Sequence, residues 1–198
     1  MQLLLPHMQP DLERWRRRSI HPLAPKELVP AHFHDLMELT LAVEAEGPPV
    51  KDGPFQQVAE SILRYDVFGP RIGESFTDRE VLEAGATVGL KYRFAPFLSM
   101  FFASRVVQVF DQEETEQGWR SGFVYQTLMG HPELGEEIFE VTKLRSGPVL
   151  YRMEAWSRPN LWFVKIFTPW ARWIQKRAAR CAGEHLGGIA QRAQRALD

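Results

Sequence analysis

A stretch near the C-terminal end of the sequence constrains the fold most. It begins Ser157-Arg158-Pro159-Asn160 and continues LWFVKIFTPWARWIQKRAARCAG to Gly183. Ser157 suits a helix N-cap, and Pro159 suits a first helical turn, where its missing N–H costs nothing. The stretch therefore predicts a long, aromatic-rich helix. A lone helix this apolar has to lie on another surface, and the strands predicted before it supply that surface.

Pro169 interrupts this predicted helix. Either it kinks one helix, or Thr168 caps a second helix that begins at Pro169. Residues 184–198 either continue the helix or fray, because glycines weaken a helix in this region. Beyond Pro169 one face recurs at helical spacing: Trp170, Trp173, Ile174, Arg177, Ala178, Cys181 and His185.

Composition bounds the class of protein. The 198 residues suit one domain, and the net charge of -1 indicates no nucleic acid as a partner. Cys181 is the single cysteine, which excludes an intrachain disulfide and a cysteine-rich zinc site. Residues 1–6 are too short an apolar run for a signal sequence, and no apolar run approaches the roughly 20 residues that span a bilayer. We therefore expect a cytoplasmic protein without a cofactor.

The first 30 residues are rich in proline and arginine. We interpret residues 1–30 as an N-terminal arm, with a short helix over 11–18 lying on the surface. Residues 31–198 then form the single domain. Leu39, Leu41 and Val43 alternate with smaller residues and favour a strand over 33–45, although Leu36, Leu39 and Val43 also suit a helix.

The middle of the chain changes its hydrophobic period. Pro54 opens a helix with one apolar stripe that ends near Tyr65, and 68–76 is predicted as loop. From Ala86 the period is two, which predicts strands over 86–92, 105–110, 119–128, 136–144 and 149–156. Between the first two strands, the apolar run 94–102 is predicted as a connection that is a lid, a dimer contact or core.

Consecutive strands joined by short turns form an antiparallel meander, and one face of such a sheet has to be covered. The aromatic C-terminal helix is the obvious cover. The fold class predicted is therefore α+β, a helix-grip fold in which a curved antiparallel β-sheet meander wraps around a long C-terminal α-helix. That arrangement often leaves a cavity between sheet and helix.

The run Ser121-Gly-Phe-Val-Tyr-Gln-Thr-Leu-Met-Gly-His-Pro-Glu-Leu-Gly-Glu-Glu-Ile-Phe139 resembles the GF.YGTLPGHPE.GEE.F signature of a family. That family is catalogued as domain of unknown function nineteen-ninety. The residues 59–68, 104–107 and 155–159 also match it in the expected order. The sequence departs from the signature at Gln126, where the family usually has Gly, and at Met129, where it usually has Pro.

The resemblance covers roughly residues 39–186. The family is similar to the START-like, Bet v 1-like group, which implies the same helix-grip arrangement. The resemblance implies no activity. The N-terminal arm is unlike the family.

The signature contains residues suited to acid–base chemistry. His131 would act as general base or acid, with its pKa set by Glu136 or Glu137. These same groups would also suit a metal ion, whereas a structural interpretation has His131 bonded to backbone within its loop. Glu136 and Glu137 point to opposite faces of a strand, which counts against a paired-carboxylate site. The pair His32 and His34 is a weak metal signal, and no metal site is predicted.

Aromatic and polar side chains on the predicted inner face would line a cavity and bind an apolar molecule, with tyrosine hydroxyls orienting it. Alternatively, they simply fill the core. Arg105 and Arg158 would each hold a carboxylate or phosphate of a ligand. The ligand-binding residues predicted are Tyr92, Arg105, Phe123, Tyr125, Phe139, Tyr151, Met153, Trp170 and Trp173.

Three functions remain open from the sequence. The favoured one is a non-catalytic module that binds a hydrophobic small molecule or lipid between the sheet and the C-terminal helix. A second is a peripheral membrane or protein-interaction domain, since Lys and Arg outnumber acidic residues from Ser157 onward and tryptophans lie among them. A third is an enzyme that uses His131 and a neighbouring Glu. A monomer and a homodimer are both compatible with the sequence.

Overall fold

The computed structural model describes residues 1–22, 33–160 and 168–197. Its strands form one antiparallel sheet in the order β2-β8-β7-β6-β5-β4-β3, and β1 pairs with β5. The helices of the described residues include α1 (Leu12–Arg16), α2 (Pro54–Leu63) and α4 (Thr168–Leu197). The strands are β1 (Gln2–Leu4), β2 (Phe33–Val43), β3 (Gly73–Thr77), β4 (Thr87–Ala95), β5 (Leu98–Glu114), β6 (Gly118–Thr127), β7 (Glu133–Leu144) and β8 (Pro148–Pro159).

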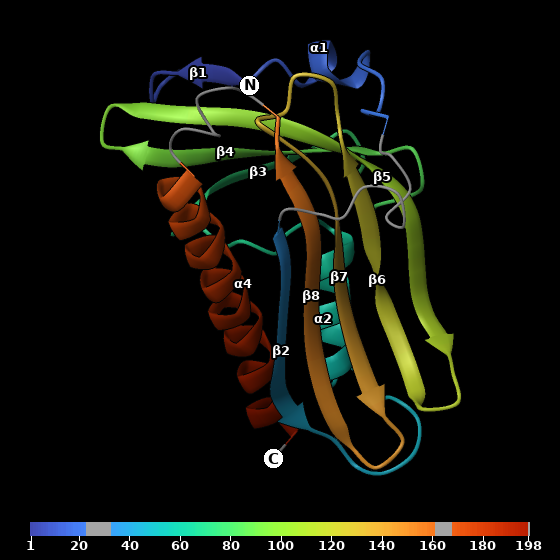
Figure 1. Cartoon of the computed structure of the whole chain (residues 1–198). Coiled ribbons are helices and arrows are strands. Elements are labelled where there is room, and N and C mark those ends of the chain that lie inside the picture. The colour runs from blue at the N-terminus through green and yellow to red at the C-terminus, as the bar shows by residue number, and fades with distance from the viewer. Residues whose placement is uncertain (23–32, 161–167, 198) are drawn as a thin grey trace.

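The sheet curves around its helices. α2 packs against β6 and β7, and α4 packs against α2 and the edge strand β2 (Figure 1). Both helices therefore cover the same face of the sheet, which is the predicted helix-grip arrangement. The predicted helix after Pro54 and the strands predicted over 119–128, 136–144 and 149–156 are confirmed.

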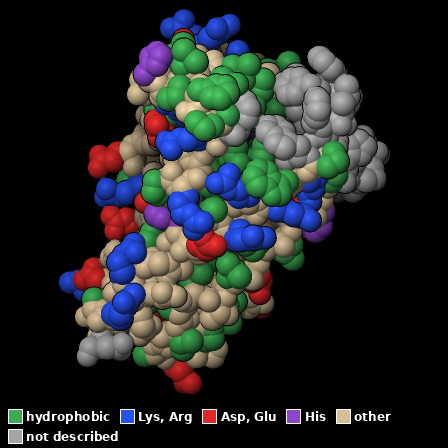
Figure 2. Space-filling model, turned by 90° about the vertical axis from the view of Figure 1, so that its left-hand side faces the viewer, with side chains coloured by type: hydrophobic (Ala, Val, Ile, Leu, Met, Phe, Trp, Pro, Cys, Tyr) green, Lys and Arg blue, Asp and Glu red, His purple; other side chains and the backbone are tan. Residues whose placement is uncertain are grey.

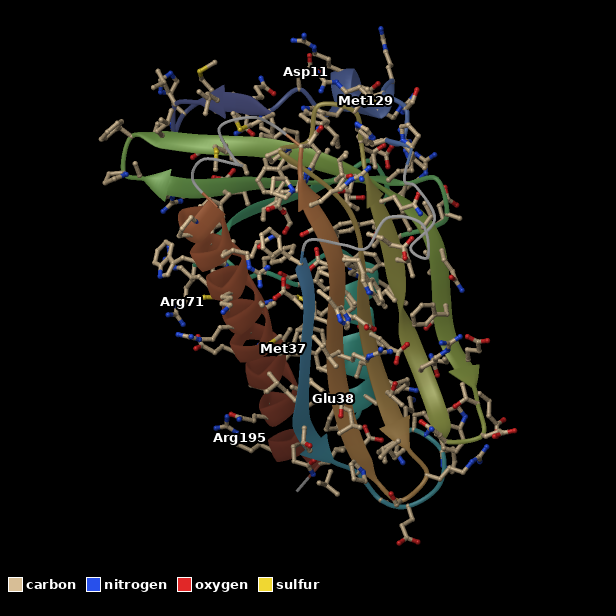
Figure 3. All side chains as sticks on the ribbon, in the orientation of Figure 1. Asp11, Met37, Glu38, Arg71, Met129 and Arg195 are labelled. Carbon is tan, nitrogen blue, oxygen red and sulfur yellow. The ribbon has the colours of Figure 1, made fainter. Side chains whose placement is uncertain are left out.

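β2 lies at the edge of the sheet beside β8, a position that no local sequence pattern indicated. It pairs with β8 from Phe33 opposite Ser157 to Val43 opposite Pro148, so the first long strand of the chain lies beside the last. This confirms a strand over this segment. Met37 and Glu38 leave the strand on opposite sides (Figure 3), and Met37 packs against the core while Glu38 is exposed.

One end of the space between sheet and helices is solidly packed. Phe123, Phe139 and Tyr151 are fully buried on the concave face of the sheet, and Phe55 and Ile62 meet them from α2. The rings of Phe123 and Phe139 stack with their centroids 5.1 Å apart on neighbouring strands. These residues anchor α2 to the sheet through apolar burial.

The N-terminal segment is more deeply integrated than predicted. Asp11 caps α1 by accepting from the backbone N–H of Arg14, so the short helix is confirmed. Its Trp15 is buried, however, and packs nearly at right angles to Phe101 of β5, with the ring centroids 6.1 Å apart. The helix lies on the surface, since Glu13, Arg14 and Arg16 are exposed, and Trp15 anchors its inner face. The boundary at residue 30 stays a prediction, since 23–32 lie outside the described residues.

The start of the C-terminal helix differs from the prediction. Ser157 is not an N-cap, because β8 continues to Pro159 and Ser157 pairs with both Gly135 and Phe33. These pairings use its backbone groups in the sheet. The described part of α4 is Thr168–Leu197, so residues 184–197 continue the helix. Whether Pro169 kinks one helix or lies at the start of a second one stays a prediction. Residues 161–167 of the predicted helix lie outside the described residues.

Two other segments predicted as connections are strands. β3 (Gly73–Thr77) pairs with β4 along the edge of the sheet. β5 takes in most of the apolar run 94–102, which is therefore a hairpin and not a connection. Both faces of this part of β5 are apolar because both are covered: Phe102 faces the α4 side, and Phe101 faces the N-terminal segment.

α4 presents two different faces. Ile174, Ala178 and Cys181 turn toward the core, as predicted, whereas Trp173 is 56% exposed. Arg71 reaches α4 from the segment after α2 and pairs with Glu184 (Figure 3). Among the described helices, none combines the length and the apolar character needed to cross a membrane.

Candidate functional site

A cavity of about 1340 Å³ lies between α4 and the concave face of the sheet. Its walls come from β2, β4, β5, β6, β7, β8 and α4, together with residues that follow α2. Protein interiors are close-packed and leave few voids larger than a water molecule. Ligand pockets measure roughly 300–1,000 Å³. A cavity of this size is therefore a candidate binding site for a small molecule.

The cavity exists because α4 carries small residues where it faces the sheet. Ala178, Ala179, Gly183, Gly187 and Gly188 all line it. A Cβ atom added at Gly187 would find its nearest neighbour, Leu41 Cδ2, at 4.0 Å, so a methyl group fits there in van der Waals contact with β2. At Gly183 a Cβ atom would lie 2.5 Å from Leu39 Cδ1, so the helix approaches the sheet closely at that point.

Most of the cavity wall is apolar or aromatic. Tyr92 is 1% exposed and lines the cavity, and its hydroxyl makes no close hydrogen bond among the described residues, although the guanidinium of Arg177 lies near it. A buried hydroxyl without a partner is unfavourable by about 1–3 kcal/mol, so a ligand that bonds to it gains affinity. The other large apolar and aromatic residues of the wall include Leu41, Tyr65, Phe68, Val88, Leu90, Met100, Phe102, Tyr125, Met153 and Ile174.

Tyr65 is held in an unusual backbone conformation. It follows the C-cap residue of α2 and has a φ of 60°. This left-handed position normally favours glycine, and a bulky residue there is strained. The Tyr65 ring packs against Phe68 and Phe123, with centroids 6.1 Å and 6.0 Å away. Packing of the ring at the cavity wall therefore offsets the strain of the backbone.

A group of carboxylates gathers at one part of the wall. Glu137 of β7 and Tyr125 of β6 are directly opposite each other in the sheet, and the Tyr125 hydroxyl donates to Glu137 Oε2. The same row continues through Ala155 of β8 to Asp35 of β2. Four neighbouring strands thus place a hydroxyl, two carboxylates and a small side chain in one line across the cavity wall.

Polar residues of α4 meet this group. Arg172 donates from both terminal nitrogens to the two carboxylate oxygens of Asp35, and from Nη1 to Gln175 Oε1 at 2.8 Å. Gln175 Nε2 donates to Glu133 Oε2 at 2.7 Å. These contacts form a chain from β2 through α4 to β7, and they orient the start of α4 over the sheet.

Burial changes the acidity of the carboxylates. Burial raises the pKa of Glu137 to about 7, although the hydrogen bond from Tyr125 opposes the rise. Burial also raises the pKa of Glu133 to about 7, against the hydrogen bond from Gln175 and the charge of Arg172. Both carboxyl groups lie deep in the fold but remain accessible from the cavity, so they change charge near neutral pH.

His131 lines the cavity and bonds to the backbone of its own loop. Its Nδ1 lies 2.9 Å from the backbone oxygen of Glu133 and 3.1 Å from the backbone nitrogen. Burial lowers the pKa of His131 to about 3, so the ring is neutral at physiological pH. The rings of His131 and Phe102 pack nearly at right angles, with their centroids 4.9 Å apart. These contacts fit the structural interpretation, in which His131 stabilises its own loop.

Glu136 and Glu137 lie in different cross-strand rows, as the alternation of side chains along a strand requires. Glu137 faces Tyr125, whereas Glu136 accepts from Gln126 Nε2 at 2.8 Å on the neighbouring row. The acid that shares the face of Glu137 is Glu133, four residues earlier on the same strand. Glu133 was not among the predicted site residues. Counting back from Glu137 by the strand period of two would have found it.

The predicted ligand-binding residues separate into two groups. Tyr92, Tyr125 and Met153 line the cavity. Phe123, Phe139 and Tyr151 instead form the packed end of the core, each with no measurable exposure. Both sequence interpretations of the aromatic face therefore apply, each to a different part of it. Tyr151 adds a buried hydroxyl without a hydrogen-bond partner among the described residues.

Arg105 and Trp173 lie away from the cavity. Arg105 donates to the backbone oxygens of Gly85, Arg16 and Arg18, so it ties the N-terminal segment to the sheet. The backbone oxygens satisfy its guanidinium, which corrects its prediction as a ligand-binding residue. Trp173 is exposed because it lies on the outer side of α4. The side chain of Trp170 lies outside the described residues.

Metal binding has no support in the geometry. No group of three His, Cys, Asp or Glu side chains among the described residues could hold an ion. His34 instead pairs with Glu154 at 2.8 Å and stacks on Trp156, and His32 lies outside the described residues. Asp35, Arg172 and Gln175 were missed by the sequence analysis, because the pairing of β2 with β8 that brings them together is long-range.

The family described as "Domain of unknown function (DUF1990)" matches residues 24–185 of this chain. A curated relative, a UPF0548 protein of Dictyostelium discoideum, is 25% identical over 130 residues, which are 62% of the chain. The match spans 60% of that relative, so the chain covers less than two thirds of its length.

Solved structures share the fold. A hypothetical protein from Helicobacter pylori has a TM-score of 0.57 at 12% identity, over 87% of this chain and 96% of that one. A protein from Nitrosomonas europaea has a TM-score of 0.51 at 12% identity, over 84% of this chain and 99% of that one. At such identities the likeness extends to the fold alone.

Proposed function

This chain belongs to the DUF1990 family, as its signature over residues 121–139 predicted, and we propose that it binds a hydrophobic small molecule or lipid without catalysis. The binding site is the cavity between α4 and the sheet. Its volume of about 1340 Å³ is the observation that carries the proposal. A folded chain gains stability by filling its interior, so a void this large is retained for an occupant.

The chemistry of the wall supports binding more than catalysis. Aliphatic and aromatic residues dominate it, and the polar groups concentrate on one part. His131, the general base that the sequence suggested, is neutral and bonded to backbone, because burial lowers its pKa to about 3. Apolar walls with few placed polar groups are typical of sites that hold a ligand and orient it.

Native mass spectrometry of gently purified protein tests the proposal. We expect an extra mass that disappears under denaturing conditions and corresponds to an apolar metabolite or lipid. Saturable binding of the neutral dye Nile red, displaced by that molecule, would place it in an apolar site. A bare protein mass, together with no saturable dye binding, would overturn the proposal.

The outer face of α4 supports a second candidate, a peripheral contact with an anionic membrane. Trp173 is 56% exposed, and the guanidinium of Arg177 lies 5.5 Å from its ring. Lys176 and Arg180 are exposed on the same helix, and Lys and Arg side chains gather across this side of the molecule (Figure 2). Basic and aromatic residues on one helix favour anionic lipid surfaces.

Sedimentation with vesicles tests this second candidate. We expect binding to vesicles of phosphatidylcholine with phosphatidylserine, and none to phosphatidylcholine alone. The variant Trp173→Ala should weaken it without change in the cavity, because Trp173 does not line the cavity. Sedimentation with neither kind of vesicle would exclude the membrane role. A cytoplasmic location stays a prediction.

A further inference from the structure

We infer that the ligand carries a basic nitrogen, which binds as an ammonium group against the carboxylate of Glu137. This inference rests on the proposed binding function and names the chemical class of the ligand: an apolar amine. The position of Glu137, the balance of charge in the cavity and a second unsatisfied polar group carry it.

The sheet leaves room beside Glu137. Its neighbour in the cross-strand row is Ala155, which lines the cavity as Glu137 does. Adjacent strands lie about 4.8 Å apart, so the small side chain on this side leaves space for a group the size of an ammonium ion. On the opposite side is Tyr125, which already donates to Glu137.

Negative charge dominates the wall. Acidic residues outnumber basic groups in it, and the basic groups are Lys176, Arg180 and the N-terminal amine of Met1, whose pKa burial lowers to about 6. None of them appears among the charges that shift the pKa of Glu137; the charged groups that do so are the carboxylates of Glu133 and Asp35. The nearby guanidinium of Arg172 already binds both oxygens of Asp35. The acidic residues of the wall are Asp35, Glu133, Glu136, Glu137 and Glu184.

This arrangement selects between ligands of opposite charge. A carboxylate or phosphate placed beside Glu137 would meet like charges at low dielectric, which is strongly unfavourable. An ammonium group would supply the cation that Glu137 lacks among the described residues, and it would form a charge-assisted hydrogen bond. The apolar body of the same molecule would fill the rest of the cavity.

A second polar group lies on another wall. The Tyr92 hydroxyl of β4 is buried and lines the cavity, and it makes no close hydrogen bond among the described residues, although the guanidinium of Arg177 lies near it. It is independent of the carboxylates, because it lies on a strand separated from β7 by β5 and β6. A ligand that spans the cavity with the amine at Glu137 therefore finds a second polar contact at Tyr92.

The inference also fixes a dependence on pH. The groups facing Glu137 are Tyr125 from β6, Glu133 from β7, Asp35 from β2, Tyr65 after α2 and Tyr151 from β8. Because burial raises its pKa to about 7, Glu137 is mostly protonated below neutral pH and ionised above it. An aliphatic amine stays protonated up to about pH 9. Its affinity should therefore rise by about tenfold from pH 6 to pH 8 and then level off.

Calorimetric titration with three probes of one shape tests the inference. The probes are 2-(1-naphthyl)ethylamine, 2-(1-naphthyl)ethanol and 1-naphthylacetate, which place a cation, a neutral group and an anion on the same ring system. At pH 8 we expect the amine to bind at least about tenfold more tightly than the alcohol, and the acetate most weakly. Only the amine should gain affinity between pH 6 and pH 8.

Glu137→Gln isolates the carboxylate. This variant should bind the amine about tenfold or more weakly than the wild type does, and its affinity for the alcohol should stay within about twofold. Glu140→Gln is the matched control, since Glu140 lies on the same strand but pairs with Arg120 outside the cavity wall. It should change neither probe. Circular dichroism confirms that both variants fold.

The outcomes separate the two proposals. Equal affinity for amine and alcohol, tighter binding of the acetate, or an unchanged amine affinity in Glu137→Gln would overturn the inference while leaving the cavity a binding site. Failure of all three probes and of Nile red to bind would overturn the proposed function itself.

Discussion

The hydroxyl of Tyr125 donates a hydrogen bond to Glu137 across the adjacent strands β6 and β7. The two residues face the cavity directly opposite each other, so one cross-strand pair sets the acidity of the deepest part of the wall. Burial raises the pKa of Glu137 and the Tyr125 hydroxyl lowers it, with burial the larger effect. The two effects together leave the pKa of Glu137 at about 7, so its carboxyl group ionises near neutral pH.

Tyr125→Phe should raise the pKa of Glu137 above about 7, because it removes a donor that stabilises the carboxylate. The ring and its packing on Phe139 are retained, with centroids now 5.7 Å apart. A titration of the Glu137 carboxyl carbon by NMR measures the shift. Gln126→Ala, which removes the partner of Glu136 on the neighbouring row, is the control and should not move it. A lower pKa in Tyr125→Phe would contradict this view.

Stability should fall as pH rises between about 4.5 and 7. Glu133 and Glu137 have pKa values raised from 4.5 to about 7 in the folded chain, so the folded state binds more protons than the unfolded state in this window. The stabilisation is complete below 4.5 and is lost as pH rises through the folded pKa.

At pH 8 the free energy of unfolding of Glu137→Gln should therefore exceed that of the wild type by roughly 1–3 kcal/mol. At pH 4.5 the difference should be much smaller. Urea denaturation of both proteins at the two pH values measures this. A variant that is less stable than the wild type at pH 8 would show that the Glu137 carboxylate is favourably solvated in the folded chain.

The ion pair of Arg172 with Asp35 joins α4 to the edge strand β2. Both side chains are mostly buried, at 20% and 27% exposure, so their pairing should exceed that of a surface pair. A double-mutant cycle with Arg172→Gln and Asp35→Asn should give a coupling energy of about 1 kcal/mol or more. Chemical denaturation measures it, and a coupling near zero would mean that the pair is solvated.

Glu44 caps α2 from outside the helix. Its carboxylate accepts from the backbone N–H groups of Phe55 at 2.7 Å and Val50 at 3.0 Å, and Gly53 at the N-cap has no side chain to do so. Glu44→Ala should destabilise the fold by about 1–3 kcal/mol. Glu46→Ala, a neighbouring acidic residue, is the comparison in thermal unfolding. Equal melting temperatures for the two variants would remove the capping role.

Local patterns predicted much of this fold. Alternation in 119–128, 136–144 and 149–156 found β6, β7 and β8 because each of these strands has one face against the core. Pro54 found the start of α2. The long C-terminal helix was found, but its start was not, because the Ser-x-Pro pattern at Ser157 suits a helix cap and the end of a strand equally well.

The site was less predictable because it depends on pairing between distant segments. Tyr125 and Glu137 were each identified, yet the row that joins them to Asp35 requires β2 to pair with β8. The cavity itself depends on Gly187 and its neighbours facing β2. In the sequence these glycines indicated only a weak helix. Whether a missing side chain leaves a cavity depends on which residues pack opposite it, and the sequence does not show that.

Gly187 offers the most direct test of the cavity as a binding site. Gly187→Leu would place a large side chain on the cavity wall beside Leu41, whereas Gly187→Ala adds helix propensity with little volume. Both variants should be more stable than the wild type by roughly 0.5–1 kcal/mol, because glycine is unfavourable within a helix.

The decisive measurement is a fluorescence titration of Nile red into the wild type, Gly187→Ala and Gly187→Leu. If the ligand occupies the cavity beneath α4, Gly187→Ala should bind nearly as the wild type does, and Gly187→Leu should lose about tenfold or more in affinity while remaining folded. Equal affinity in all three proteins would place the binding elsewhere and contradict the account.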